Sequence, residues 1–284
     1  MKLLAIKLYN LVYRIFSGSG IYKIAFVKKV NKKILTLVRQ KTVVVNGLIL
    51  NLDKKDSLNL SVNRNYEPEE TAFLKATIKK GQHVIDIGAN IGYYTTLLAS
   101  LVGEHGKVYA FEPDTENFEL LNRNIAANGF KNVVVENLAV SETSRDILLF
   151  YSGDKGDQRI YDSSDGRQSM KIKATSIDDY FANINHSIDF IKMDIQGAEG
   201  LALQGMEKTI RKNKGIILNI EFWPFGLEKS AFGSLNFLNA LVRCGLVFYD
   251  LNNKRLSQAN REEFVKVYKP ETKAFTNLIC SHAD

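Results

Sequence analysis

A glycine-containing turn at residues 84–92 is the first part of the sequence suited to binding a ligand. It reads Val-Ile-Asp-Ile-Gly-Ala-Asn-Ile-Gly, which is a short apolar strand leading into a turn and then a helix. At the carboxyl end of a parallel strand, a turn of this kind forms a ligand crevice. We expect Gly88 to let the backbone turn and approach a ligand closely, and Gly92 to let the helix pack near the strand.

The second glycine of a dinucleotide-binding turn is missing here. The pattern Gly-x-Gly-x-x-Gly uses that glycine to clear space for a pyrophosphate. Asn90 stands at this position and would crowd a pyrophosphate. S-adenosylmethionine has no phosphate, so the turn suits that cofactor. Glu112 ends the next apolar strand, where a carboxylate can accept hydrogen bonds from both ribose hydroxyls.

A second group of polar residues lies around the predicted fourth and fifth strands of the main sheet. Lys192 and Asp194 point to one face because strand side chains alternate, and Glu199 follows about one helical turn later. Glu221 ends the next strand. A cluster of this kind can supply a general base for a hydroxyl, and we expect Asp194 to be that base. Two alternatives are a divalent-metal site and a structural Lys192–Glu221 ion pair with Glu199 capping a helix.

Short apolar runs alternate with amphipathic helices from about residue 66 onward. We expect strands near 83–87, 107–112, 132–136, 188–194, 215–222, 246–251 and 276–280, and helices near 91–102, 115–128, 199–213 and 230–243. This alternation predicts an α/β fold, a seven-stranded, mostly parallel sheet with helices on both faces. The polar segment 151–169 is expected to be a long loop that contributes to acceptor binding.

The N-terminal part differs from the rest in charge and pattern. Residues 1–40 are expected to form a basic amphipathic helical extension of two helices, which either packs as a lid or contacts an anionic membrane surface. Asn46-Gly47 between two apolar runs predicts a β-hairpin. Pro68 is expected in the first turn of a helix that stops at Gly81. The main domain is then expected over 41–284, with its core at about 66–282.

The charge distribution argues against a basic nucleic-acid-binding surface on the main domain. The chain has 38 Lys and Arg against 31 Asp and Glu, a net charge of +7, but residues 1–52 contain ten basic residues and no acidic one. The remaining residues therefore have a net charge of −3. The two cysteines, Cys244 and Cys280, lack metal-ligand spacing and are expected to be reduced thiols of a cytoplasmic protein. Polar residues interrupt the apolar run at the N-terminus, so a signal peptide is not expected.

Five blocks in order resemble the FkbM-type methyltransferases, a family that methylates oxygen in natural products and sugars. They are VIDIGANIGYYT at 84–95, FEPD at 111–114, NLAVS at 137–141, FIKMDIQGAE at 190–199 and EFWP at 221–224. The resemblance implies a class I, Rossmann-like fold that binds S-adenosylmethionine. It implies cofactor contacts from Asp86, Gly88, Ala89, Asn90, Ile91, Gly92, Glu112, Pro113, Leu138, Ala139 and Asp194. Gln196 departs from the family pattern, in which many members have Glu.

The function expected from these residues is O-methylation of a hydroxyl on a sugar, glycolipid or small metabolite. A nucleic-acid methyltransferase is the first alternative, favoured only by the basic extension, and a non-catalytic cofactor-binding module is the second. We therefore expect a small-molecule or carbohydrate acceptor, a cytoplasmic protein, and peripheral membrane contact, if any, through residues 1–40. The sequence leaves the oligomeric state and the metal requirement open.

Overall fold

The computed structural model of the protein describes residues 36, 39–152, 156–252, 257 and 260–283. The two helices predicted for the N-terminal extension lie almost entirely outside these residues. The chain divides into two compact units, Met1–Tyr66 and Glu67–Asp284. Each unit is considered by itself below.

The described part of the first unit contains the predicted hairpin. Strands β1 (Thr42–Val45) and β2 (Leu48–Asn51) pair antiparallel, and a short helix, α3 (Leu60–Asn63), follows them. Asn46 and Gly47 have φ angles of 54° and 81°, the left-handed conformation that a tight two-residue turn requires. The hairpin prediction is confirmed.

The second unit is built on a seven-stranded sheet with the order β11-β12-β10-β9-β3-β4-β5. The strands are β3 (His83–Ile87), β4 (Lys107–Phe111), β5 (Val133–Glu136), β9 (Phe190–Met193), β10 (Ile217–Phe222), β11 (Leu246–Asp250) and β12 (Thr276–His282). All seven fall where the sequence predicts a strand. Four strand pairs are parallel: β3 with β4, β3 with β9, β4 with β5, and β9 with β10. Strand β12 runs antiparallel to both of its neighbours, β10 and β11. The sheet is therefore mixed.

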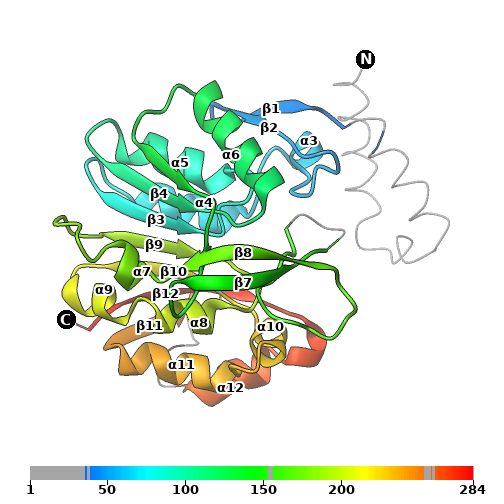
Figure 1. Cartoon of the computed structure of the whole chain (residues 1–284). Coiled ribbons are helices and arrows are strands. Elements are labelled where there is room, and N and C mark those ends of the chain that lie inside the picture. Colours follow the sequence, from blue (N-terminus) through cyan, green and yellow to red (C-terminus); the bar gives the residue numbers. More distant parts are fainter. Residues whose placement is uncertain (1–35, 37–38, 153–155, 253–256, 258–259, 284) are drawn as a thin grey trace. The chain divides into compact units, whose positions relative to one another are not determined.

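Helices cover both faces of this sheet. They are α4 (Pro68–Thr77), α5 (Tyr93–Val102), α6 (Thr115–Ala127), α7 (Ile177–Tyr180), α8 (Glu199–Gln204), α9 (Glu207–Lys212), α10 (Pro224–Lys229), α11 (Ser234–Arg243) and α12 (Arg261–Val267), with a 3-10 turn at Pro270–Thr272. Figure 1 shows α5 and α6 toward the β4 end of the sheet and α11 and α12 toward the β11 end. Successive side chains of β4 point to opposite faces of the sheet. Phe111 packs in the larger hydrophobic core, and Ala110 packs in a smaller core with Leu121 of α6.

Three helix predictions are wrong in their limits. The helix predicted for 199–213 is broken into α8 and α9, because Gly205 packs so tightly that a β-carbon there would lie 2.1 Å from the carbonyl oxygen of Ser141. The carboxylate of Asp178 then accepts the N–H groups of Lys208 and Thr209 at the start of α9. The helix predicted for 230–243 begins only at Ser234, after the separate helix α10. Helix α4 begins at Pro68 as expected but ends at Thr77, four residues before Gly81.

A small second sheet was not predicted. Strands β6 (Ala139–Val140), β7 (Arg145–Phe150) and β8 (Ser169–Thr175) form a three-stranded sheet in the order β6-β8-β7. The polar segment 151–169 connects β7 to the start of β8, which agrees with its prediction as a loop. Throughout the part of the chain that the structure describes, no helix combines the length and apolar character needed to cross a membrane.

Candidate active site

The glycine turn joins β3 to α5 at the carboxyl edge of the sheet. The N–H groups of Gly88 and Ala89 both donate to the carbonyl oxygen of Phe111, at 3.0 Å each, which ties the turn to the end of β4. Gly88 has a φ angle of 85°, and a β-carbon on it would lie 2.0 Å from the carbonyl oxygen of Asp194. The ends of β3, β4 and β9 therefore meet at this turn.

Gly92 serves a different contact from the one predicted. Its φ angle is 88°, and a β-carbon on it would lie 2.5 Å from Cδ1 of Leu121. The residue thus allows α6, rather than the preceding strand, to approach the start of α5. Ile91 and Ala89 are buried beside it. Their side chains support the turn, so any contact they make with a ligand comes from the backbone.

Glu112 fixes the turn from the next strand. Its Oε2 accepts the N–H of Asn90 at 2.8 Å, and its Oε1 accepts the N–H of Asp114 at 2.9 Å. Burial raises the pKa of the Glu112 carboxyl to about 7, although the same two backbone N–H groups oppose this shift. Glu112 therefore has a structural task besides the predicted ribose contact.

The segment predicted to lie along the adenine is attached to Glu112. The side-chain amide of Asn137 donates to the carbonyl oxygens of Glu112 and Pro113, at 2.9 and 3.1 Å. Leu138 packs against the larger core, and Ala139 is buried as the first residue of β6. These contacts place residues 137–139 next to the end of β4. A cofactor that contacts both Glu112 and residues 138–139 requires this arrangement.

Two acceptor groups in this region, one of them unsatisfied, fit S-adenosylmethionine. The side-chain oxygen of Asn90 is buried without a hydrogen-bond partner, in a residue whose φ angle of 50° is unusual outside glycine. Each carboxylate oxygen of Glu112 has a second lone pair beyond the one used by the backbone. The turn thus retains acceptors for ammonium and hydroxyl donors. When bound, S-adenosylmethionine supplies an electrophilic methyl group on a positively charged sulfur.

Asp86 is buried beneath the turn. Its Oδ2 accepts the hydroxyl of Thr95 at 2.6 Å, and its side chain is 1% exposed. Burial raises the pKa of the Asp86 carboxyl to about 6, against the opposing charge of Lys192. Asp86 and Lys192 are paired in register across β3 and β9, so the two strands bring these charges together.

Lys192 lies at the centre of a group of carboxylates. Its Nζ is 3.7 Å from Oε1 of Glu70, 3.9 Å from Oδ2 of Asp194 and 4.3 Å from the centre of the Tyr94 ring. Burial alone would lower the pKa of this ammonium, but the charges of Glu70 and Asp194 raise it above its ordinary value. The alternative of a Lys192–Glu221 ion pair is wrong, because within the described residues the ion pairs of Lys192 are with Glu70 and Asp194.

Asp194 and Glu221 are joined through one side chain. The amide of Gln196 donates to Oδ1 of Asp194 at 2.9 Å and to Oε2 of Glu221 at 3.3 Å. Burial, followed by the charges of Asp194 and Glu199, holds the pKa of the Glu221 carboxyl well above its usual range. Gln196 has a φ angle of 56°, so the backbone is turned sharply where the amide reaches both carboxylates. The residue that departs from the family pattern thus links two of the three predicted catalytic acids.

Glu199 mainly organises the loop that precedes α8. Its Oε1 accepts the N–H groups of Ile195 and Gly197, at 3.0 and 3.2 Å. Burial raises the pKa of the Glu199 carboxyl to about 7. These contacts differ from the alternative in which Glu199 caps a helix, because both N–H groups belong to the loop before α8 and the N-cap residue of α8, Ala198, makes no side-chain cap hydrogen bond. The other carboxyl oxygen of Glu199, Oε2, is buried without a partner.

Four residues of the cluster were missed by the sequence analysis. The hydroxyl of Tyr94 lies 2.8 Å from Oε2 of Glu67 and 2.6 Å from Oε2 of Glu70, and the side-chain amide of Asn219 donates to Oε1 of Glu70 at 2.6 Å. The signal was weak, because Glu67 and Glu70 flank Pro68 and look like ordinary acids of a first helical turn. Only the fold shows that α4 begins beside the end of β9.

The polar segment 151–169 reaches this cluster through Tyr161. The Tyr161 hydroxyl donates to the carbonyl oxygen of Gln196 at 2.7 Å. The Arg159 guanidinium lies 5.2 Å from the centre of the Trp223 ring, within range of a cation–π contact. The segment therefore adjoins the residues that follow β9 and β10, as its predicted role in acceptor binding requires.

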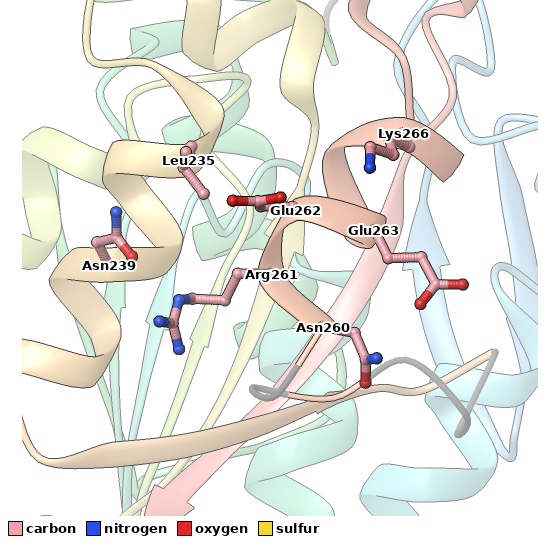
Figure 2. A pocket seen from close by; sticks show the side chains of 7 residues that line it. All are labelled: Leu235, Asn239, Asn260, Arg261, Glu262, Glu263 and Lys266. Atoms are coloured by element: carbon pink, nitrogen blue, oxygen red, sulfur yellow. The ribbon is translucent and has the colours of Figure 1, made fainter.

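An open groove on the described surface lies elsewhere. It has a volume of about 550 Å³ and is lined by Leu235, Asn239, Asn260, Arg261, Glu262, Glu263 and Lys266. Figure 2 shows these side chains on α11 and on α12 with the residue before it. None of the predicted site residues lines this groove, so it is not where we place the chemistry. Among the described residues, no group of three or more His, Cys, Asp or Glu is arranged to hold a metal ion.

The fold and this turn together define a methyltransferase that depends on S-adenosylmethionine. The Methyltransferase FkbM domain matches residues 86–245, which is more than half of the chain. The chain belongs to the FkbM methyltransferase family, as the five sequence blocks indicated.

Curated relatives match over shorter stretches. A protein-L-isoaspartate O-methyltransferase from Archaeoglobus fulgidus is 38% identical over 58 residues, which is 20% of this chain and 27% of that protein. Another protein-L-isoaspartate O-methyltransferase, from Aeropyrum pernix, is 43% identical over 54 residues, 19% of this chain and 21% of its own length. The chain thus spans about a quarter of the length of these relatives.

Solved structures of similar fold are distant in sequence. A SAM-dependent methyltransferase from Aquifex aeolicus has a TM-score of 0.42 and 18% identity, with 75% of this chain and 88% of that chain covered. Aeropyrum pernix fibrillarin, in complex with natively bound S-adenosyl-L-methionine, has a TM-score of 0.41 and 12% identity, with 74% and 72% covered.

Proposed function

We propose that the protein transfers the methyl group of S-adenosylmethionine to a hydroxyl oxygen of a sugar, glycolipid or small metabolite. The observation that carries this proposal is the position of Asp194. Its carbonyl oxygen lies against Gly88 of the cofactor turn, and its side chain is 22% exposed. An accessible carboxylate beside the cofactor is suited to take the proton of an acceptor hydroxyl.

The charge of the site supports a neutral acceptor. The carboxylates of Asp194 and Glu70 lie beside a single ammonium, that of Lys192. An acceptor carrying phosphates would be repelled by these carboxylates, whereas hydroxyl groups of a sugar can donate hydrogen bonds to them. Trp223 follows the end of β10 and offers an aromatic ring near Arg159, which suits the apolar face of a sugar ring.

A nucleic-acid acceptor is the competing proposal. It draws support from the ten basic residues within 1–52, which attract phosphates irrespective of sequence. The same residues suit the lid and membrane-contact alternatives equally. The acidic carboxyl edge of the sheet favours the hydroxyl acceptor at the point where the chemistry occurs.

A screen for methyl transfer separates these acceptors. The full chain would be incubated with S-adenosylmethionine labelled on its methyl group and, separately, with sugar nucleotides, glycolipids, small hydroxylated metabolites and tRNA. We expect label in a hydroxyl-bearing acceptor and none in tRNA. Incorporation into tRNA alone would contradict the proposed acceptor class while leaving the cofactor assignment intact.

A further inference from the structure

The acidic cluster has more carboxyl groups than its one ammonium can balance. Its acidic members come from α4, β3, the end of β9, α8 and β10, and they are Glu67, Glu70, Asp86, Asp194, Glu199 and Glu221. Within the described residues, the ion pairs of this cluster involve Lys192 only. Like charges at these separations disfavour one another's ionisation, so some of the carboxyls hold protons when no other cation is present.

Unsatisfied oxygens show that the cluster is built to receive a further partner. Oε2 of Glu199 and Oδ1 of Asn219 are both buried without a hydrogen-bond partner, in side chains that are 0% and 1% exposed. Asn219 donates to Glu70, and the charge of Glu199 acts on Glu221. Buried acceptors of this kind are costly unless a donor or a positive charge comes to them.

The hydroxyl of Tyr94 shows where one proton resides. It lies within hydrogen-bond distance of two carboxyl oxygens, Oε2 of Glu67 at 2.8 Å and Oε2 of Glu70 at 2.6 Å. A phenol has one hydrogen and can donate it to only one of these oxygens. The other contact therefore needs a hydrogen from the carboxyl itself, which then donates to the phenol oxygen.

Glu70 is the member of this pair that stays ionised. Burial would raise the pKa of its carboxyl, but the Lys192 ammonium and the donors around it hold that pKa below its ordinary value. Burial and the neighbouring Glu70 raise the pKa of the Glu67 carboxyl to about 9, with a further contribution from the charge of Asp194. The shared proton is therefore on Glu67.

The backbone of Glu67 is held in an unusual conformation at this point. Its φ angle is 42°, in the left-handed region, and Pro68 follows as the first residue of α4. Strain of this kind persists where the surrounding contacts fix the residue, and it occurs often at functional sites. The contact with Tyr94 is what fixes the Glu67 carboxyl here.

We propose that Glu67 exchanges its proton for the positive charge of the cofactor: it is protonated in the free enzyme and ionised when S-adenosylmethionine is bound. The groups that act on it are Glu70 of the helix that follows it, Tyr94 of α5, Lys192 and Asp194 of the β9 segment, and Glu221 of β10. A cation entering among these groups favours the charged form of a nearby carboxyl. Proton release on cofactor binding depends only on the use of S-adenosylmethionine. Proton uptake during methyl transfer rests on the proposed function, transfer to a hydroxyl.

The exchange reverses during turnover. The acceptor oxygen forms a bond to the methyl carbon and loses its hydrogen, while the bond from that carbon to sulfur breaks and its electron pair stays on the sulfur. One proton is released and one positive charge on sulfur disappears. Asp194, the proposed base, takes that proton from the acceptor hydroxyl, and the cluster passes it on to Glu67, which holds it once the sulfonium charge has gone. The site is then ready to release a product without the sulfonium charge.

Calorimetry with the two forms of the cofactor tests this inference directly. S-adenosylmethionine and its demethylated product, S-adenosylhomocysteine, differ by one methyl group and the sulfonium charge, which lowers the pKa of the nearby α-ammonium. A pH titration of each free ligand therefore gives its own proton count, which is subtracted before the two are compared. Titrations of the full chain in buffers of different ionisation enthalpy count the protons released on binding. Near neutral pH we expect S-adenosylmethionine to release about one proton more than S-adenosylhomocysteine. Equal proton counts would overturn the inference.

Variants on one helix assign the proton to its residue. Glu67→Gln keeps the size of the side chain and should abolish the difference between the two ligands while retaining affinity for S-adenosylhomocysteine. Glu69→Gln, at an exposed position two residues away, is the matched control and should keep the difference. A difference that persists undiminished in Glu67→Gln would overturn the assignment to Glu67.

A second measurement needs no variant. In the wild-type protein, the ratio of the affinities for S-adenosylmethionine and S-adenosylhomocysteine should rise about tenfold per pH unit where one proton is exchanged. A ratio that is independent of pH would overturn the inference even if Glu67→Gln did not fold. Failure of both ligands to bind would instead contradict the cofactor assignment, so the two kinds of failure are distinct.

Discussion

The carbonyl oxygen of Asp194 lies 2.0 Å from the position that a β-carbon would occupy on Gly88. The N–H of Asp194 also donates to the carbonyl oxygen of Ile87 at 3.1 Å, so the backbones of the two strand ends are in direct contact. Only glycine fits at residue 88, both for this space and for its φ angle of 85°. The cofactor turn and the proposed base are therefore parts of one rigid junction.

Substitution of Gly88 should break this junction. We expect Gly88→Ala to lose most of its affinity for S-adenosylmethionine, measured by calorimetry, because the β-carbon must displace the backbone of Asp194. Gly81→Ala is the matched control, since Gly81 has nearly the same φ angle, 86°, with no atom within 4 Å of the added carbon. The control should lose about 1–2 kcal/mol of folding stability from its left-handed backbone and bind normally. Equal binding by both variants would show that the junction does not shape the cofactor site.

Substitution of Glu112 should affect both stability and binding. Glu112→Gln replaces an acceptor of two backbone N–H groups by a side chain with one acceptor oxygen, so one buried N–H loses its partner. We expect a loss of about 1–3 kcal/mol in urea unfolding and a cofactor affinity roughly tenfold weaker. Glu119→Gln, on the exposed face of α6, should change neither quantity. Normal affinity in Glu112→Gln would place the ribose elsewhere.

The stability of the free protein should fall as the pH rises from about 5 to about 9. Folding raises the pKa of Asp86 to about 6, of Glu112 and Glu199 to about 7, and of Glu67 to about 9. The folded state thus binds more protons than the unfolded state across this interval, and deprotonation favours unfolding. Urea unfolding at a series of pH values measures the slope, which Glu67→Gln should reduce most at the alkaline end. Stability that increases over the same interval is the result that this account excludes.

Chelation should leave activity unchanged. The ammonium of Lys192 lies 3.7 Å from Glu70 and 3.9 Å from Asp194, so it already holds the position in which a divalent ion would neutralise these carboxylates. The transfer rate measured with an active acceptor should be the same before and after treatment with EDTA. A loss of activity that magnesium restores would instead assign these carboxylates to a metal site.

The sheet could be predicted from the sequence because its strands are short apolar runs separated by helical patterns. Strands β3 and β9, for example, are buried along nearly their whole length, which leaves an uninterrupted apolar signal around Asp86 and Lys192. The small sheet was missed because β7 and β8 are largely exposed and carry no such signal. The break between α8 and α9 was missed because it depends on contact between Gly205 and Ser141, which are far apart in the sequence.

The candidate site was predicted only in part, for a similar reason. Residues at strand ends, such as Asp194 and Glu221, can be found because parallel strands bring their carboxyl ends together. Glu67 and Glu70 precede the first strand of the sheet, and their approach to Lys192 depends on where α4 packs. The pairing of Lys192 with Glu70 instead of Glu221 likewise follows from this packing.

The most direct test of the account is the turnover of Asp194→Asn. This substitution keeps the shape of the side chain and removes the proposed base, so with an acceptor identified by the screen, turnover should fall roughly 100-fold or more while S-adenosylmethionine binds with little change. Asp146→Asn, at an exposed carboxylate of the small sheet, serves as the control and should retain full activity. Near-normal turnover in Asp194→Asn, with the cofactor still bound, would contradict the central claim that Asp194 takes the proton of the acceptor hydroxyl.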